Sequence, residues 1–286
     1  MTASKQTTSS IPVERYRDTL LNMLPDYIID ELIHKKTVHP KVYRHSTILF
    51  TDVVRFSRLS VHLDPVTLIR RLDSYVTLHD RIMEEFGIEK IKTIGDSYMC
   101  VSGIPSKKAS HAVDCCLAAL NLLHVLEEMK GDPKVVAEEN LDLKNWSFRI
   151  GIHTGPCISG MIGYKKYTFD IWGDSVNVAS RMEAAGEPGR INISEDTYKE
   201  VKDLFDCTYR GTQEVQKIGP VEMYFLNGIR SPLCEDKKGY FPNREFNALY
   251  CRKFKVTDAS PILSSLPHFI QNYIRQEGKQ GVNKNE

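Results

Sequence analysis

The order of its apolar segments constrains the fold of this chain more than any other feature of its sequence. Short runs rich in β-branched and aromatic residues predict strands, and long stretches with apolar side chains three and four residues apart predict helices. In order, we expect a strand at 46–51, a helix at 65–85, strands at 88–93 and 97–102, a helix at 109–130 and a strand at 147–153. Gly95-Asp96 joins the two middle strands as a hairpin. This is the split βαβ order of ferredoxin-like folds, an α/β (α+β) architecture with helices packed on a sheet.

Further elements flank this pattern. Beyond it we expect a charged loop at 131–144, a strand-like run at 157–163, a short helix at 174–185, a strand at 190–194 and an edge strand at 219–226. Residues 12–36 have a helical pattern that Pro25 interrupts, and 262–274 form an amphipathic stretch. The chain therefore divides into a disordered N-terminus and helical segment at 1–45, a main domain at 46–230 and a C-terminal extension at 231–286.

Composition argues against several classes of protein. A formal net charge of +1 gives no global basic excess of the kind that nucleic-acid binding needs. No apolar run reaches the roughly 18 residues of a membrane-spanning helix, and the polar N-terminus lacks the apolar core of a signal peptide. The seven cysteines are odd in number and match neither a zinc site nor a disulfide framework. We therefore expect a reduced, cytoplasmic protein without a transmembrane segment.

Two aspartates stand at places where a sheet can hold metal ions. Asp52 ends the first expected strand, and Asp96 lies at the turn of the hairpin. Neighbouring strands would bring the two carboxylates to one end of the sheet, where a pair of carboxylates can hold two divalent cations for phosphoryl chemistry. Taken singly, each residue is equally well explained as a helix cap or a turn residue.

Asn177, Arg181 and Arg149 are further polar candidates. Asn177 and Arg181 lie four residues apart on the expected helix at 174–185, so they share a face. An arginine there can stabilise charge on phosphoryl oxygens, and an amide can orient a ribose. An isolated pair of this kind is more often a solvated helix face, and Arg149 alternates with apolar neighbours as residues on the polar face of a sheet do.

The chain resembles the class III nucleotidyl cyclases in four segments. They are ILFTDVVRFS at 48–57, IKTIGDSYMCVSG at 91–103, RIGIHTG at 149–155 and FDIWGDSVNVASRM at 169–182. They occur in the family's order and spacing over about residues 40–228, and four in order are far more specific than one. The resemblance implies a cyclase homology domain that works as a head-to-tail homodimer with composite active sites, and an enzyme with two Mg²⁺ or Mn²⁺ ions per site.

The resemblance also implies roles for individual residues. Asp52 and Asp96, with the backbone of Val53, would hold the metal ions, and Arg149 would contact the terminal phosphates. From the partner chain, Asn177 would hold the ribose, Arg181 would act at the α-phosphorus, and a lysine would bind the β and γ phosphates. Lys217 is the nearest match to that lysine, although the register there slips by about one residue.

Two positions bear on the choice of base. Adenine-selective members of the family carry Lys and Asp where this chain has Lys92 and Asp170, and guanine-selective members typically carry Glu and a small residue such as Cys. The chemistry agrees, since a lysine donates to N1 of adenine and an aspartate accepts from its N6 amine, whereas guanine presents the opposite pattern. The resemblance therefore implies an adenylyl cyclase that converts ATP to 3′,5′-cyclic AMP and pyrophosphate.

Several points stay open in the sequence. Many members of the family have Gly at the position of Arg55, which puts the geometry of the phosphate loop in question. Residues 20–43 resemble a coupling segment that precedes bacterial cyclase domains, and a helix docked on its own domain explains them equally well. A guanylyl or dual-specificity cyclase is the alternative among enzymes, and a module that binds nucleotide without turnover is the alternative outside them. No part of the sequence identifies a regulator.

Overall fold

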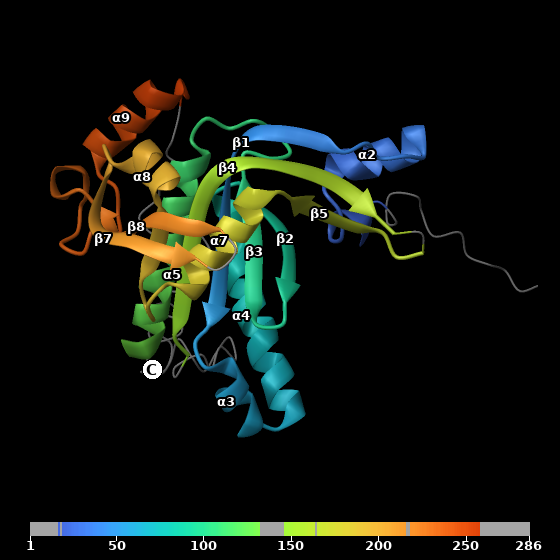
Figure 1. The fold of residues 1–286 in the computed structure, drawn as a ribbon, viewed down its shortest axis with the longest axis horizontal. Helices are drawn as coiled ribbons and strands as arrows, with labels where there is room; N and C mark the ends of the chain where they lie inside the picture. The colour runs from blue at the N-terminus through green and yellow to red at the C-terminus, as the bar shows by residue number, and fades with distance from the viewer. Residues whose placement is uncertain (1–16, 18, 132–145, 164, 216–217, 258–286) are drawn as a thin grey trace, which may run out of the picture. The chain divides into compact units, whose positions relative to one another are not determined.

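The strands of the computed structural model form one sheet among the residues that it describes, which are 17, 19–131, 146–163, 165–215 and 218–257. The strands are β1 (Lys41–Val53), β2 (Glu89–Ile94), β3 (Ser97–Ser102), β4 (Phe148–Ile162), β5 (Thr168–Trp172), β6 (Ile191–Ser194), β7 (Phe205–Val215) and β8 (Gly219–Ile229). Their spatial order is β2-β3-β1-β4-β6-β8-β7, and β5 pairs with β4 (Figure 1).

Helices connect these strands (Figure 1). They are α2 (Asp26–Lys35), α3 (Phe56–Val61), α4 (Pro65–Glu85), α5 (His111–Gly131), α7 (Asp174–Ala184), α8 (Glu195–Val201) and α9 (Arg244–Phe254), with a 3-10 turn, η1, at Ser231–Leu233. The contacts divide the chain into two units. One comprises residues up to 41 together with 159–170, and the larger one comprises 42–158 and the residues from 171 onward.

The predicted ferredoxin-like core is confirmed in the larger unit. β1 lies antiparallel to β3, with Leu49 opposite Cys100, and β3 lies antiparallel to β2, with Thr93 opposite Tyr98. α3 and then α4 connect β1 to β2, and α5 connects β3 to β4. The spatial order β2-β3-β1-β4 is that of the split βαβ motif.

The central strands are buried on both faces, which explains their continuous apolar character. Leu49 of β1 packs into the large cluster that includes α4, α5, α8 and α9. Its neighbours Ile48 and Phe50 point to the other face and pack with Ile171 and Ala179. Side chains that alternate across a strand therefore supply two separate cores.

Three strand predictions need correction. β1 begins at Lys41, five residues before the expected start. The runs expected at 147–153 and 157–163 form one continuous strand, β4. Pro156 does not interrupt this strand, because only Ile150–Ile152 pair with β6 and Pro156 lies beyond that ladder. The stretch expected as an edge strand, β8, lies between β6 and β7. The edge on this side of the sheet is β7, a mostly exposed strand whose polar sequence gave no apolar signal.

The chain after residue 230 continues the larger unit. Asn243 caps α9 by accepting a hydrogen bond from the Phe246 N–H at 3.0 Å. Phe246 and Tyr250 are buried, and the Tyr250 hydroxyl donates to Asp114 of α5 at 2.6 Å. Sequence reasoning missed α8 and α9. The amphipathic stretch expected at 262–274 lies outside the described residues, as do residues 132–144 of the expected charged loop and residues 1–16.

The smaller unit contains α2, which begins after Pro25, the residue at which the expected helical pattern is interrupted. Residues 17 and 19–21 are also helical, and residues 12–16 of that pattern lie outside the described residues. Ile28 and Ile29 are buried. The Tyr27 hydroxyl lies 3.3 Å from the Ser159 hydroxyl, and its ring packs edge-on against Phe169 with centroids 6.1 Å apart. This helix is therefore docked within its own unit.

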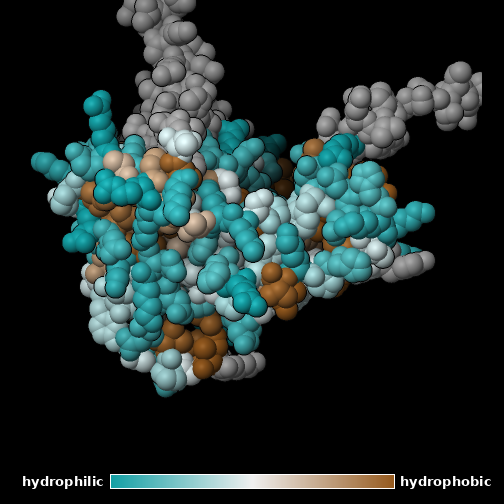
Figure 2. All heavy atoms as spheres, turned by 90° about the horizontal axis from the view of Figure 1, so that it is seen from above, coloured by the Kyte–Doolittle hydropathy of each residue, from teal (hydrophilic) through white to brown (hydrophobic). Residues whose placement is uncertain are grey.

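The surface is mainly hydrophilic on the face that Figure 2 shows, where hydrophobic residues form separate patches. Within the described part of the chain, no helix is both long and apolar enough to cross a membrane.

Candidate active site

Asp52 and Asp96 lie close together at one end of the sheet. Asp52 is near the end of β1, and Asp96 lies in the turn between β2 and β3; the register pairs Thr51 with Tyr98 beside them. Partial burial, and then the nearby charge of Asp52, raise the pKa of Asp96, while a hydrogen bond from the Val53 backbone acts in the opposite direction. The antiparallel pairing of β1 with β3 therefore brings together two carboxylates that are 44 positions apart.

Arg149 of β4 completes a charged cluster with these carboxylates. Its Nη2 donates to Asp52 Oδ2 at 2.8 Å, and its Nε forms an ion pair with Glu183 Oε1 at 2.9 Å. The Arg149 side chain is 29% exposed and that of Asp52 is 21% exposed, so both can be reached from solvent. Arg149 thus stands between two carboxylates with part of its guanidinium open to solvent.

Sequence reasoning missed Glu183. It follows the FDIWGDSVNVASRM segment by one residue and lies on α7, with a side chain that is 9% exposed. Burial, followed by the charge of Asp52, raises the pKa of Glu183 to about 7 against the opposing effect of Arg149. The only signal in the sequence was its position two residues after Arg181, which puts it on a different face of the helix.

Gly151 lets α7 approach β4 at this point. A Cβ at residue 151 would lie 1.9 Å from the backbone N of Glu183 and 2.6 Å from the carbonyl carbon of Met182. The RIGIHTG segment therefore has two roles. Arg149 supplies the guanidinium, and Gly151 leaves the space for α7, the helix that carries Glu183, the ion-pair partner of Arg149.

A buried hydrogen-bond chain lies beside Asp52. The hydroxyl of Thr51 is 2.6 Å from that of Tyr75 and 3.0 Å from His79 Nε2, and His79 Nδ1 is 2.8 Å from the Tyr75 carbonyl. That carbonyl can only accept, so Nδ1 carries the proton and Nε2 accepts from Thr51. Burial lowers the pKa of His79 to about 3, so the ring is neutral.

Asn177 and Arg181 lie on α7 away from this cluster. Asn177 is exposed and Arg181 is partly exposed, whereas the buried face of the helix carries Ala179, Met182 and Glu183. Within the described ranges Arg181 forms no ion pair. This outward position is compatible with their predicted roles in the active site of a partner chain. Those roles stay a prediction.

For the remaining predicted residues, the structure gives the position of each one separately but not their positions relative to each other. Lys92 lies on β2 opposite Met99 and is partly exposed. Asp170 lies on β5 and is 7% exposed. The two belong to different units, so their joint contact with a base stays a prediction. Lys217 lies outside the described residues.

The aspartate pair fits a hard divalent cation. Carboxylate and backbone carbonyl oxygens are the donors that Mg²⁺ and Mn²⁺ prefer. Burial and the neighbouring Asp52 raise the pKa of Asp96, and a cation bound between the two carboxylates would favour their charged forms. Among the described residues no group of three or more His, Cys, Asp or Glu side chains could hold a metal ion. Water and substrate oxygens would therefore complete the coordination, which is usual for Mg²⁺.

Comparison with known proteins identifies the family. Residues 38–228 match the model of the adenylate and guanylate cyclase catalytic domain. The chain therefore belongs to the class III nucleotidyl cyclases, and the resemblance found in its four segments is confirmed.

Relatives fall on both sides of the substrate division. An adenylate cyclase of Mycobacterium tuberculosis is 33% identical over 219 residues, which cover 75% of this chain and 47% of that protein. Guanylate cyclase 32E of Drosophila melanogaster is 35% identical over 216 residues, covering 74% of this chain and 18% of that protein. The chain thus spans half or less of these relatives.

Solved structures show the same division. The adenylyl cyclase CyaB from P. aeruginosa is 28% identical, with a TM-score of 0.60 over 66% of this chain and 95% of that one. A guanylate cyclase domain from Catenaria anguillulae, in complex with GTP, is 30% identical, with a TM-score of 0.57 over 65% of this chain and 97% of that one.

Proposed function

We propose that this protein is an adenylyl cyclase that converts ATP to 3′,5′-cyclic AMP and pyrophosphate. The observation that carries the cyclase chemistry is the contact of Asp52 with Arg149 beside Asp96, at one end of the sheet. The choice of ATP rests on the residue types at Lys92 and Asp170.

The described side chains suit the handling of a triphosphate. Asp52 and Asp96 would hold two divalent cations, which would stabilise negative charge on the phosphate oxygens. Arg149 would exchange its contact with Asp52 for the terminal phosphates, and its ion pair with Glu183 would keep the guanidinium at the site. Asn177 and Arg181 of a second copy of the chain would orient the ribose and stabilise charge at the α-phosphorus.

Adenine selectivity follows from hydrogen-bond matching. The Lys92 ammonium can donate to N1 of adenine, and the Asp170 carboxylate can accept from its N6 amine. Guanine would place an N1 donor before the lysine and an O6 acceptor before the aspartate. Mismatched buried polar groups cost about 1–3 kcal/mol each, which is enough for a clear preference.

Product analysis tests the activity. Purified protein with ATP and Mn²⁺ should form cyclic AMP, and Asp52→Ala and Asp96→Ala should abolish it. Tight ATP binding without pyrophosphate release at high protein concentration would instead indicate a binding module. Mixing Asp96→Ala with Arg181→Ala should restore part of the activity, since one of the two composite sites is then intact; no restoration would contradict shared sites.

A guanylyl cyclase is the second candidate, because several similar proteins are guanylyl cyclases. Competition between ATP and GTP decides between the two, with ATP as the expected substrate. The double variant Lys92→Glu, Asp170→Cys should shift the preference toward GTP. An unchanged preference would contradict the proposed roles of these two residues.

A further inference from the structure

A hollow lined by charged side chains lies far from the carboxylate cluster, between the start of β1 and the loop that leads into α5. Its volume is about 600 Å³, which is within the range of small-molecule sites. The titratable residues that line it are Tyr43, Arg44, His45, Lys107, Lys108, His111 and Glu200.

The hollow carries an excess of positive charge. Arg44, His45 and Lys107 are exposed, and none of the three forms an ion pair with any residue in the described part of the chain. Lys108 is paired with Asp114 at 2.8 Å, so it adds no net charge. Glu200 is the one carboxylate of the lining and cannot neutralise both Arg44 and Lys107. Uncompensated like charges around one concave surface attract anions.

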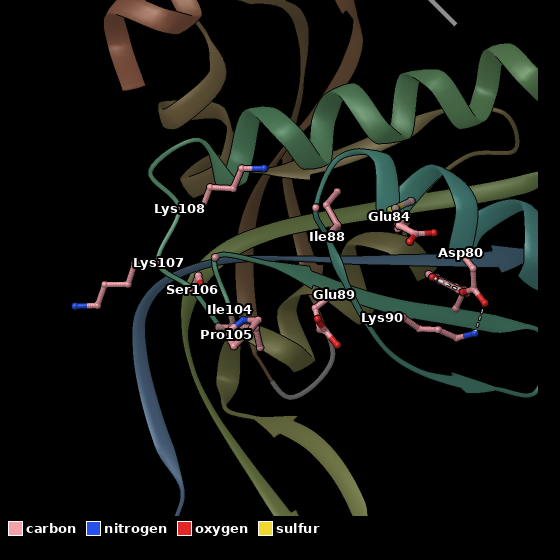
Figure 3. A pocket seen from close by; sticks show the side chains of 14 residues that line it. Asp80, Glu84, Ile88, Glu89, Lys90, Ile104, Pro105, Ser106, Lys107 and Lys108 are labelled. Atoms are coloured by element: carbon pink, nitrogen blue, oxygen red, sulfur yellow. Dashed lines mark hydrogen bonds and ion pairs between the residues drawn. The ribbon is translucent and has the colours of Figure 1, made fainter. Parts of the chain in front are cut away.

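The loop at residues 104–108 separates this hollow from a neighbouring one, whose charged lining residues are Asp80, Glu84, Glu89, Lys90, Lys107 and Lys108. There the three carboxylates are matched by three lysines, and Lys90 is paired with Asp80 at 2.7 Å. Figure 3 shows that Lys107 points away from these carboxylates. The charge of Lys107 is therefore left available to the hollow that it shares with Arg44.

The inner wall of the hollow is rigidly held. His111 Nδ1 is 2.7 Å from the Thr47 hydroxyl, and Lys108 Nζ donates to the Phe86 carbonyl at 2.8 Å. Burial, and then the positive charge of His45, lower the pKa of His111 to about 4. The 21-residue helix α5 begins at His111, so its dipole adds partial positive charge at the same place.

The hollow is separate from the candidate active site. Arg44 and Asp52 lie on the same strand, eight positions apart, and a strand rises about 3.3 Å per residue, so about 26 Å separate them. A nucleotide bound at Asp52 and Asp96 would therefore not fill it.

We propose that this hollow binds a small, multiply charged oxyanion, with Arg44 and Lys107 as its charged contacts. Phosphate esters and polycarboxylates share this chemistry, and both can form charge-assisted hydrogen bonds with arginine and lysine.

Calorimetric titration of the metal-free protein tests the proposal, with inorganic phosphate and citrate as separate probes at constant ionic strength. At least one probe should bind saturably at millimolar concentrations, and the probe that binds tells phosphate from carboxylate chemistry. The double variant Arg44→Ala, Lys107→Ala should weaken binding about tenfold or more, which corresponds to about 1.4 kcal/mol.

Two controls keep the result specific. Lys237→Ala with Arg252→Ala removes the same charge from exposed positions elsewhere and should leave binding unchanged. Arg149→Ala removes the guanidinium of the candidate active site and should also leave it unchanged. Absence of saturable binding by either probe, or binding lost in Arg149→Ala but retained in the Arg44→Ala, Lys107→Ala variant, would overturn the proposal. Neither result depends on catalysis, so the test stands apart from that of the proposed function.

Discussion

Glu183 of α7 forms an ion pair of 2.9 Å with Arg149 of β4, and this pair connects the helix that carries Asn177 and Arg181 to the strand beside Asp52. Arg149 therefore forms ion pairs with two carboxylates, those of Asp52 and Glu183. The relative strength of these two ion pairs determines how tightly the guanidinium binds Asp52 when no substrate is present.

Replacing Glu183 should strengthen the hold of Arg149 on Asp52. With Glu183→Gln, Asp52 becomes the only carboxylate that Arg149 contacts, so we expect a higher Mn²⁺ requirement and a raised KM for ATP. Loss of this partly buried pair should also lower the free energy of unfolding by about 1–2 kcal/mol. Steady-state kinetics against Mn²⁺ and urea unfolding measure the two effects.

Glu187→Gln is the matched control, because Glu187 is exposed and forms only long ion pairs, at 3.9 Å to Arg190 and 3.8 Å to Arg210. Exposed pairs contribute at most about 1 kcal/mol, and neither the Mn²⁺ requirement nor KM should change. Equal kinetic behaviour of the two variants would show that Glu183 does not position Arg149.

Gly151→Ala should be strongly destabilising. The added methyl would lie 1.9 Å from the Glu183 backbone, and both contacting segments are backbone that must shift. We expect a loss of about 2–3 kcal/mol in the free energy of unfolding. Gly189→Ala separates sterics from backbone strain, since nothing lies within 4 Å of its Cβ but its φ is +73°; about 1 kcal/mol is expected there. Urea denaturation of both variants measures the difference, and equal losses would contradict this account.

The sequence predicted the core of the fold because its central strands are buried on both faces and its helices have one apolar face. Asp52 and Asp96 were identified for a similar reason, since a strand end and a hairpin turn are visible locally. β7 was missed because an edge strand that is mostly exposed needs no apolar pattern. Glu183 was missed because its importance comes from its contact with Arg149 of β4, which is 34 residues away in the sequence, and no local signal reports such a contact.

Two buried histidines should make the protein less stable in mild acid. The pKa of His79 is lowered to about 3 and that of His111 to about 4, both from 6.5. Between pH 6.5 and 4 the unfolded chain takes up protons that the folded chain refuses, so stability falls as the pH falls, by up to about 1.4 kcal/mol per pH unit for each ring. Glu183, with its pKa raised to about 7, takes up a proton in the folded state and acts in the opposite direction.

The test is therefore a difference between variants. His79→Gln removes one titrating ring, and the stability of this variant relative to wild type should rise as the pH is lowered from 7 to 5. Chemical denaturation at several pH values measures this. A constant difference across the range would show that His79 titrates alike in the folded and unfolded states.

Arg55→Gly should stabilise the protein. Arg55 has φ +59° and ψ +31° at the start of α3, the left-handed region in which a side chain costs about 1–2 kcal/mol. Glycine removes that strain but adds about 0.5–1 kcal/mol of backbone entropy to the unfolded state, so we expect a net gain of roughly 0.5–1 kcal/mol. Arg58→Gly, in the helical part of α3, should lose about 1 kcal/mol instead. Thermal unfolding compares the two, and a loss in both would mean that contacts of the Arg55 side chain outweigh the strain of its backbone.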